Sequence, residues 1–446
     1  MAIHLTIEKM VYGGDGLARY AEEGAASHKN PTAEAKSHRG KTVLLPFVLG
    51  GEEVEASVTE EERGFFRARP EKIVSPSPHR IQPGCPYFEE CGGCHYQHSD
   101  YQHQLEIKAG VLRETLLRTA KIDWQDEIRL HPSPPWNYRN RARMKVQAQP
   151  FAIGYYRFGS HNLLPVQQCP ISSALINRAL AAVWKLGGNA ELDGVAEIEF
   201  FADAADAQLL IEIYLSAGQA PGQANDPELK KLAEDLAALI PEVAGIVFFA
   251  VERDGTAHAI SVLGDQELIY KTACANYRVS AGSFFQTNRF MIDELTTLVT
   301  AGRTGASVFD LYAGVGLFSV PLAKNFEKVV AVESAPASFA DLRRNVPSNV
   351  STHCVTTETL LTKLSPGLKK ADYVVVDPPR AGLGEKVANL LAKLAAPRLA
   401  YVSCDPATLA RDLKTLAAGG YRMEAIHLID LFPQTFHIES AVFLDR

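Results

Sequence analysis

Residues 308–323 read VFDLYAGVGLFSVPLA, and this stretch decides the fold. An apolar strand runs into a glycine turn, and a helix follows the turn. Gly314 and Gly316 carry no side chain, so the backbone can approach a nucleotide-like ligand closely. The next strand, KVVAVES, ends near Glu333, whose carboxylate can accept hydrogen bonds from ribose hydroxyls. The turn lacks the third glycine that packs a helix against a pyrophosphate, so the pattern favours S-adenosylmethionine over NAD.

Strands and helices alternate from Ser283 to the end of the sequence. Near-continuous apolar runs such as YVVVD are typical of strands that are buried on both faces of a mainly parallel sheet. Ligands of such folds bind at the carboxyl ends of the strands. We therefore expect an α/β, Rossmann-like domain over residues 283–446, with its site at that edge.

Three polar residues stand at the predicted ligand edge. Asp377 ends one strand and precedes two stiffening prolines, although a plain strand-to-helix turn explains this pattern equally well. Cys404 ends the next strand, and a helix N-terminus after it would lower the thiol pKa. A lone cysteine is more often inert and buried, but its place beside the other motifs reverses that preference. Glu439, before the last strand, can act as a general base or simply cap the strand.

The seven cysteines are an odd number for a protein built on disulfides. Three of them lie within ten residues, and their spacing is Cys-x5-Cys-x2-Cys with a distant fourth thiol. The four residues are Cys85, Cys91, Cys94 and Cys169. Four thiolates can hold a [4Fe–4S] cluster or zinc. Zinc sites usually show two close pairs, so the spacing favours the iron–sulfur cluster.

The totals set limits on the class of protein. A chain of 446 residues is long enough for two or three domains. Its net charge of −7 and pI near 6.0 give no support to a protein that coats nucleic acid through bulk positive charge. We expect a cytoplasmic protein without a membrane segment, because no apolar run spans a bilayer and the N-terminus lacks a secretion signal. We also expect a monomer.

The N-terminal half reads as two further domains. Short strands in residues 1–76 predict a small β-barrel of the OB type, with a long loop inserted at 21–40. Residues 77–282 predict a central α+β domain with the cysteines. Helical spacing over 101–120 predicts a connecting helix, which can pack on the catalytic domain.

A basic stretch interleaved with aromatic residues lies in the central domain. Its basic residues alternate along one strand, and they are Arg139, Arg141, Arg143 and Lys145. Alternating side chains share one side of a strand, so these residues can contact RNA phosphates together. A solvated strand face explains the charge pattern equally well.

The motifs together resemble one family, the iron–sulfur RNA 5-methyluridine methyltransferases, over nearly the whole chain. SFFQTN, DLYAGVGLFS, VDPPRAG, SCDPATLARDL and HIES stand in that family's order, and the cysteines look like its cluster ligands. The N-terminal strands resemble its TRAM domain, an OB-like RNA-binding module.

The resemblance implies a role for each matching residue. Cys404 would be the nucleophile and Glu439 the base that removes the C5 proton of uracil. The contacts to S-adenosylmethionine would come from Gln286, Tyr312, Gly314, Glu333, Glu358 and Asp377. The target uridine would be flipped out or already unpaired, because pairing hides C6. Large-subunit 23S ribosomal RNA is the expected substrate, with transfer RNA as the alternative.

Two other classes compete with this interpretation. A radical methylthiotransferase also joins a TRAM module to an iron–sulfur cluster, but it uses Cys-x3-Cys-x2-Cys in a different barrel. A non-catalytic RNA-binding protein could keep the same scaffold. The intact Cys404, Asp377 and Glu439 argue against that second alternative.

Overall fold

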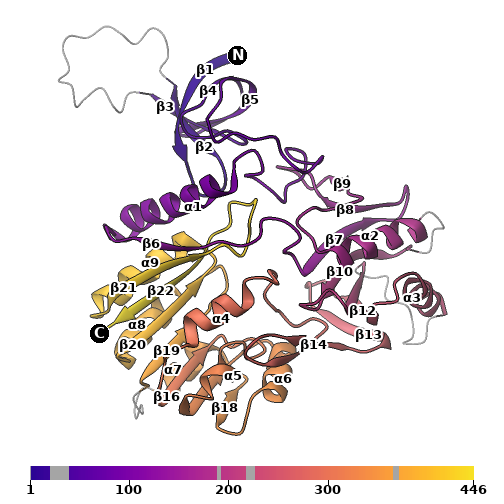
Figure 1. Cartoon of the computed structure of the whole chain (residues 1–446), viewed down its shortest axis with the longest axis vertical. Coiled ribbons are helices and arrows are strands. Elements are labelled where there is room, and N and C mark those ends of the chain that lie inside the picture. The colour runs from indigo at the N-terminus through magenta and orange to yellow at the C-terminus, as the bar shows by residue number, and fades with distance from the viewer. Residues whose placement is uncertain (1, 21–39, 188–191, 217–226, 365–370) are drawn as a thin grey trace. The chain divides into compact units, whose positions relative to one another are not determined.

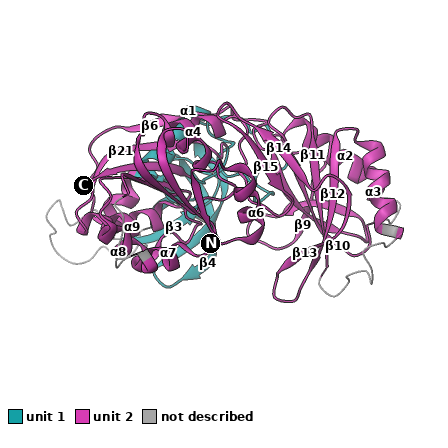
Figure 2. Ribbon diagram, turned by 90° about the horizontal axis from the view of Figure 1, so that it is seen from below, with its two compact units in different colours: residues 1–112, 434–437 teal, residues 113–433, 438–446 magenta. Residues whose placement is uncertain are grey.

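The computed structural model describes residues 2–20, 40–187, 192–216, 227–364 and 371–446 (Figure 1). The chain divides into two compact units, which are coloured separately in Figure 2. Unit 1 comprises residues 1–112 and 434–437, and unit 2 comprises 113–433 and 438–446. The predicted inserted loop at 21–40 lies outside the described residues except for Gly40. The division into three domains stays a prediction.

Unit 1 begins with a closed five-stranded barrel in the order β1-β2-β3-β5-β4. Its strands are β1 (Ala2–Met10), β2 (Gly16–Tyr20), β3 (Lys41–Leu45), β4 (Glu53–Glu62) and β5 (Phe65–Ser75). Ile3, Leu5 and Ile7 alternate with polar residues along β1 and are buried in the barrel core, because successive side chains of a strand point to opposite faces. The structure confirms the predicted N-terminal barrel.

Glu52, between strands β3 and β4 of the barrel, binds the start of the cysteine-bearing segment at residues 77–80. This carboxylate is fully buried and accepts hydrogen bonds from the Leu49 and Ser77 amides and from the Arg80 guanidinium. The predicted connecting helix then follows as α1 (Tyr101–Thr115) and a π-helical turn, η2 (Leu116–Ala120). The boundary between the two units falls within α1.

Unit 2 contains a seven-stranded sheet in the order β13-β12-β11-β10-β7-β8-β9. Its strands are β7 (Arg141–Gln147), β8 (Ala152–Tyr156), β9 (Leu163–Pro165), β10 (Val195–Ala202), β11 (Leu209–Leu215), β12 (Val243–Val251) and β13 (Ala257–Gly264). The helices α2 (Ala174–Gly187) and α3 (Pro227–Leu239) contact each other and pack against this sheet. A separate two-stranded ribbon follows, with β14 (Glu267–Lys271) and β15 (Asn276–Ser280).

The second sheet of unit 2 has eight strands in the order β18-β17-β16-β19-β20-β22-β21-β6. Its strands are β6 (Ile128–His131), β16 (Gly305–Leu311), β17 (Phe326–Val332), β18 (Val350–His353), β19 (Tyr373–Val376), β20 (Arg398–Ser403), β21 (Arg422–Ile429) and β22 (Glu439–Asp445). Only β22 pairs antiparallel with its neighbours in this sheet, among the described residues. The predicted mainly parallel sheet is therefore confirmed.

Helices cover both faces of this sheet. They are α4 (Ile292–Thr300), α5 (Ser319–Leu322), α6 (Pro336–Asn345), α7 (Thr357–Leu364), α8 (Gly384–Leu394) and α9 (Pro406–Ala418). Val402 belongs to the same buried cluster as Leu295 of α4, whereas the hydroxyl of the adjacent Tyr401 donates to Asp412 of α9. Neighbouring residues of a strand face opposite sides, so α4 and α9 lie on opposite faces. The turn η2 packs against α9.

Candidate active site

The order of the strands reverses at β16, which has β17 on one side and β19 on the other. Ligands of open parallel sheets bind outside the carboxyl ends of the strands at such a reversal. The glycine turn follows β16, and Asp377 follows β19. The structure therefore brings two of the predicted motifs to this point of the sheet.

The glycine turn is closed by the carboxylate of Glu333. One oxygen of Glu333 accepts a hydrogen bond from the Gly314 amide at 2.9 Å, and the other accepts from the Ala335 amide at 2.6 Å. Gly316 has a φ of +99°, and a Cβ atom there would lie 3.0 Å from the Leu342 side chain. A side chain at Gly316 would therefore strain the backbone and crowd its neighbour.

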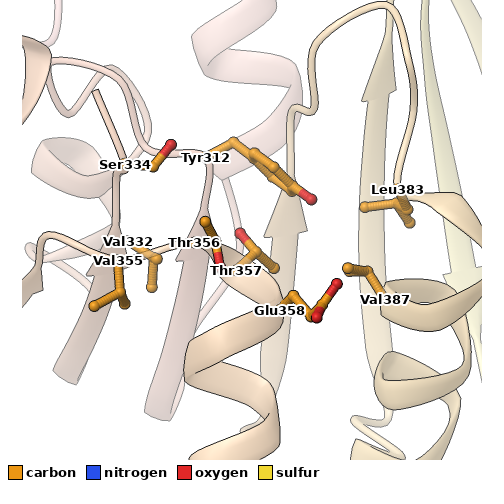
Figure 3. A pocket seen from close by; sticks show the side chains of 9 residues that line it. All are labelled: Tyr312, Val332, Ser334, Val355, Thr356, Thr357, Glu358, Leu383 and Val387. Carbon is orange, nitrogen blue, oxygen red and sulfur yellow. The ribbon is translucent and has the colours of Figure 1, made fainter.

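A cavity of about 420 Å³ opens beside this turn. It is lined by Tyr312, Val332, Ser334, Val355, Thr356, Thr357, Glu358, Leu383 and Val387. In Figure 3 the Tyr312 ring extends toward Leu383, and the Glu358 carboxylate points toward Val387. Apolar walls with a few polar groups are typical of a site for a small ligand.

The predicted cofactor contacts take different positions relative to this cavity. Tyr312 and Glu358 line it, and Glu333 stands between the lining residues Val332 and Ser334. The Glu358 carboxylate also pairs with the Lys386 ammonium at 2.7 Å. The remaining predicted contacts are not part of the described lining, and they are Gln286, Gly314 and Asp377.

The predicted nucleophile and base meet through the pairing of β20 and β22. Ser403 is paired with Ser440 in the antiparallel register, so the next residue in each direction, Cys404 and Glu439, emerges at the same edge. The charges of Glu439 and Asp377 both act on the Cys404 thiol. The sheet thus gathers a thiol and two carboxyl groups that are far apart in the sequence.

Burial dominates the electrostatics of this edge. It raises the pKa of Asp310 to about 7, although a hydrogen bond from Ser319 opposes the shift, and the Glu333 charge adds to it. Burial, and then the Asp310 charge, raise the pKa of Asp377 to about 7. Burial and the Asp377 charge raise the pKa of Glu439 well above its usual value. Neighbouring carboxyls that cannot all ionise bind protons readily.

The expected lowering of the Cys404 pKa is wrong. Burial raises the pKa of this thiol to about 12, the charges of Glu439 and Asp377 add to the shift, and the Arg380 charge opposes it. The first amides of α9 are also already occupied, because the Asp405 carboxylate accepts from Ala407 at 3.0 Å and from Thr408 at 2.8 Å. The dipole of the helix is therefore offset by its own cap.

One of the predicted RNA contacts, Arg141, is engaged within the protein, and its contact with RNA stays a prediction. Arg141 is a half-buried residue whose guanidinium donates to the carboxylates of Glu199 and Glu212. A third hydrogen bond runs to the carbonyl of Ser283. Arg141 is thus occupied within the protein, because the basic side of β7 faces acidic residues on β10 and β11.

The other predicted RNA contacts are placed differently. Arg143 and Lys145 share the carboxylate of Glu197, and their side chains are 46% and 38% exposed. Arg139 is half-buried. Contact of these three residues with RNA stays a prediction.

The structure describes all four predicted cluster ligands, and none of them is in a disulfide. Cys94 is buried, and the other three are half-buried. Cys85, Cys91 and Cys94 belong to unit 1, and Cys169 belongs to unit 2. Within the described ranges, no three His, Cys, Asp or Glu side chains form a group that could hold a metal ion.

Two features of the structure were not predicted from the sequence. Phe284 is 64% exposed, whereas the adjacent Phe285 is buried. The sequence SFFQTN contains both rings and does not indicate which of them faces outward. Arg380 is the cation that acts on Cys404, and a charge next to two prolines gave no signal of that proximity.

A ligand cavity at the reversal of a mainly parallel sheet, together with a thiol beside carboxyl groups, defines a group-transfer enzyme capable of covalent catalysis. Comparison with known proteins narrows this class. Residues 100–446 match the family model described as tRNA (uracil-5-)-methyltransferase. The chain therefore belongs to this family, and the predicted RNA uracil-5 methyltransferase resemblance is confirmed.

Similar proteins extend over nearly the whole chain. An uncharacterized RNA methyltransferase of Aquifex aeolicus is 30% identical, over 99% of this chain and 98% of its own length. The 23S rRNA (uracil(1939)-C(5))-methyltransferase RlmD of Pectobacterium atrosepticum is 31% identical, over 91% of this chain and 90% of its own length. The same fold is found in the Pyrococcus abyssi tRNA (uracil-54, C5)-methyltransferase, whose structure was solved with S-adenosyl-L-homocysteine. The TM-score is 0.72 at 24% sequence identity, and the match covers 99% of this chain and 100% of that chain. No helix in the described ranges has the length and apolarity needed to cross a membrane.

Proposed function

We propose that this protein transfers a methyl group from S-adenosylmethionine to C5 of a uridine in 23S ribosomal RNA. The proposal depends most on the meeting of Cys404 and Glu439 at the edge where the cavity lies. The relative from Pectobacterium atrosepticum, whose name specifies 23S rRNA, supports the choice of RNA. Transfer RNA is the second candidate, because the family description names it. The cytoplasmic location and monomeric state stay predictions.

Cys404 activates the uracil ring. C5 of uracil is too weak a nucleophile to take a methyl group unaided, so the sulfur of Cys404 first bonds to C6. The thiol proton passes to a neighbouring carboxylate, and the electrons of the C5=C6 bond move toward O4 to give an enolate. Asp377 is a suitable acceptor because burial makes it more basic, and its use leaves the Glu439 carboxylate for the later step.

Glu439 completes the reaction. S-adenosylmethionine, when bound, supplies an electrophilic methyl group and a positive charge. A positive charge near Asp377 would favour the ionised form of this carboxyl, whose pKa burial raises. C5 of the enolate would take the methyl group as the bond from that group to the sulfonium sulfur breaks, which leaves neutral S-adenosylhomocysteine. The Glu439 carboxylate would then remove the C5 proton. The electrons left at C5 reform the C5=C6 bond as the bond from Cys404 to C6 breaks.

Trapping of the covalent intermediate tests this mechanism. RNA that contains 5-fluorouridine is incubated with the protein and S-adenosylmethionine, because fluorine cannot leave as a proton does. We expect an adduct that survives denaturation in the wild type and is absent in Cys404→Ala. Cys354→Ala, which removes an exposed thiol of the same unit, should keep the adduct. Absence of any adduct with both ribosomal and transfer RNA would contradict the proposal.

We also propose a [4Fe–4S] cluster held by Cys85, Cys91, Cys94 and Cys169. The spacing of the thiols supports it, and thiolates are the donors that such clusters use. No metal-holding group is present in the described ranges, so we assign no catalytic step to the cluster. Iron and sulfide analysis of protein purified without oxygen tests the proposal. A protein without iron that methylates RNA at the full rate would contradict it.

Contact with RNA is proposed for three features. The N-terminal barrel would act as the TRAM module, and Arg139, Arg143 and Lys145 would contact phosphates. The exposed ring of Phe284 offers a surface on which a base can stack. Mapping of 5-methyluridine in ribosomal and transfer RNA from cells with and without the protein distinguishes the two candidate substrates.

A further inference from the structure

The loop between β15 and α4 carries one exposed aromatic side chain among three buried residues at 283–286. Ser283 is fully buried, and Phe284 is 64% exposed. Phe285 packs in the core, and Gln286 is again buried. The loop turns at Gly282, which has a φ of +81°. The direction of Phe284 and Gln286 therefore depends on how Ser283 is held.

Asp341 of α6 holds this loop from one side. Its fully buried carboxylate accepts three hydrogen bonds, from the Ser280 amide at 2.8 Å, the Ser280 hydroxyl at 2.6 Å and the Ser283 hydroxyl at 2.7 Å. A carboxylate that accepts several donors fixes their geometry strongly.

Arg141 of β7 holds the same residue from the other side. Its guanidinium donates to the Ser283 carbonyl while Glu199 and Glu212 hold the remaining nitrogens. The hydroxyl of Tyr214 in turn donates to Glu212. The planar fork of an arginine is suited to several acceptors at fixed angles. Ser283 is thus bound through its hydroxyl by the second sheet's α6 and through its carbonyl by the first sheet.

Helix α6 also connects this loop to the glycine turn. The helix begins just after Ala335, whose amide binds Glu333. At its other end, the Asn345 amide group donates to the Val315 carbonyl at 2.9 Å and to the Arg278 carbonyl at 3.0 Å. One helix therefore sets the distance between the glycine turn and the loop.

We propose that Arg141 and Asp341 are positioning residues, which hold Ser283 from both sides and so place Gln286 against the cofactor and Phe284 toward RNA. This inference rests on the proposed function and on the sequence-based prediction that Gln286 contacts S-adenosylmethionine. In this proposal neither residue contacts substrate or cofactor directly. They act through the backbone of residues 280–286.

Substitutions at Asp341 test the proposal. In Asp341→Ala, all three hydrogen bonds are lost, and we expect the affinity for S-adenosylhomocysteine to fall about tenfold or more, by calorimetry, because small misplacements of binding groups are costly. Asp341→Asn keeps an acceptor and should stay within about threefold of the wild type. The amides of residues 281–286 should exchange hydrogen faster in Asp341→Ala.

Asp372 provides a matched control. Its carboxylate also binds backbone amides, those of Ala306 at 2.7 Å and Ser307 at 2.9 Å, but it does so at the amino end of β16. Asp372→Ala should lower the melting temperature without changing the affinity for S-adenosylhomocysteine. Equal losses of affinity in Asp372→Ala and Asp341→Ala would overturn the proposal, since both would then report general destabilisation.

Arg141→Lys tests the other side. Lysine keeps a cation near Glu199 and Glu212 but lacks the fork that reaches the Ser283 carbonyl. We expect weaker S-adenosylhomocysteine binding and faster exchange at 281–286, in a protein that still melts cooperatively. Unchanged affinity and exchange in both Arg141→Lys and Asp341→Ala would refute the inference. These readouts need no RNA, so a wild type that binds S-adenosylhomocysteine but never methylates uridine would refute the proposed function alone.

Discussion

Asp310 should make the stability of the ligand-free protein depend on pH. It is fully buried, one carboxylate oxygen accepts from the Ser319 hydroxyl, and the other has no hydrogen-bond partner among the described residues. Burial raises its pKa from 3.8 to about 7. Between these two values the folded protein binds a proton that the unfolded chain has lost. The free energy of unfolding therefore falls as pH rises through this window.

The size of the effect follows from the two pKa values. A difference of about three pH units corresponds to about 4 kcal/mol, reached at a rate of about 1.4 kcal/mol for each pH unit. Asp377 titrates in the same range and shares part of this change. Asp310→Asn removes the titrating group, so its stability relative to the wild type should increase between pH 5 and pH 8. The buried Asn amide lowers the free energy of unfolding by about 1–3 kcal/mol at every pH. This constant loss does not change how the difference from the wild type varies with pH.

Urea denaturation at a series of pH values measures the difference. Ser319→Ala is the matched variant of opposite sign, because it removes the hydrogen bond that opposes the pKa shift of Asp310. Its stability relative to the wild type should decrease further as pH rises. An equal difference in free energy of unfolding between Asp310→Asn and the wild type at pH 5 and pH 8 would refute this prediction.

Three further predictions concern the site. Glu439→Gln should accumulate a denaturation-resistant adduct between Cys404 and ordinary RNA, visible on denaturing gels, because the C5 proton has no base; rapid turnover without adduct would refute this role. Gly316→Ala should lower the free energy of unfolding, measured with urea, by about 1–3 kcal/mol, because φ is +99° and the Leu342 side chain is close. Unchanged stability would contradict this prediction. Asp405→Ala removes the cap of α9 and should cost about 0.5–2 kcal/mol, whereas a gain in stability would show that the cap is dispensable.

Local patterns were enough to predict the barrel, the mainly parallel sheet and the ligand edge. Alternation of apolar residues decides which face of β1 is buried, and continuous apolar runs such as that of β19 place a strand in the middle of a sheet. The meeting of Cys404 with Asp377 follows from the rule that parallel strands end at one edge. These features depend on residues close together in the sequence.

Partners that are distant in the sequence could not be predicted. The sequence did not show that Arg141 donates to Glu199 and Glu212, which lie 58 and 71 residues later. The pKa of Cys404 is raised first by burial and then by the charges of Glu439 and Asp377, which come from other strands. Charge pairing across strands depends on register, and register is a property of the folded sheet.

Strand β22 is the last strand of the sequence but lies between β20 and β21 in the sheet. During synthesis, a chain that has been made only as far as β21 leaves both of these neighbours with an unpaired edge, which is prone to pairing with other chains. Glu439 also arrives only with this strand. In the proposed mechanism, an incomplete nascent chain would therefore have Cys404 without Glu439, and we expect activity only after β22 has left the ribosome and inserted.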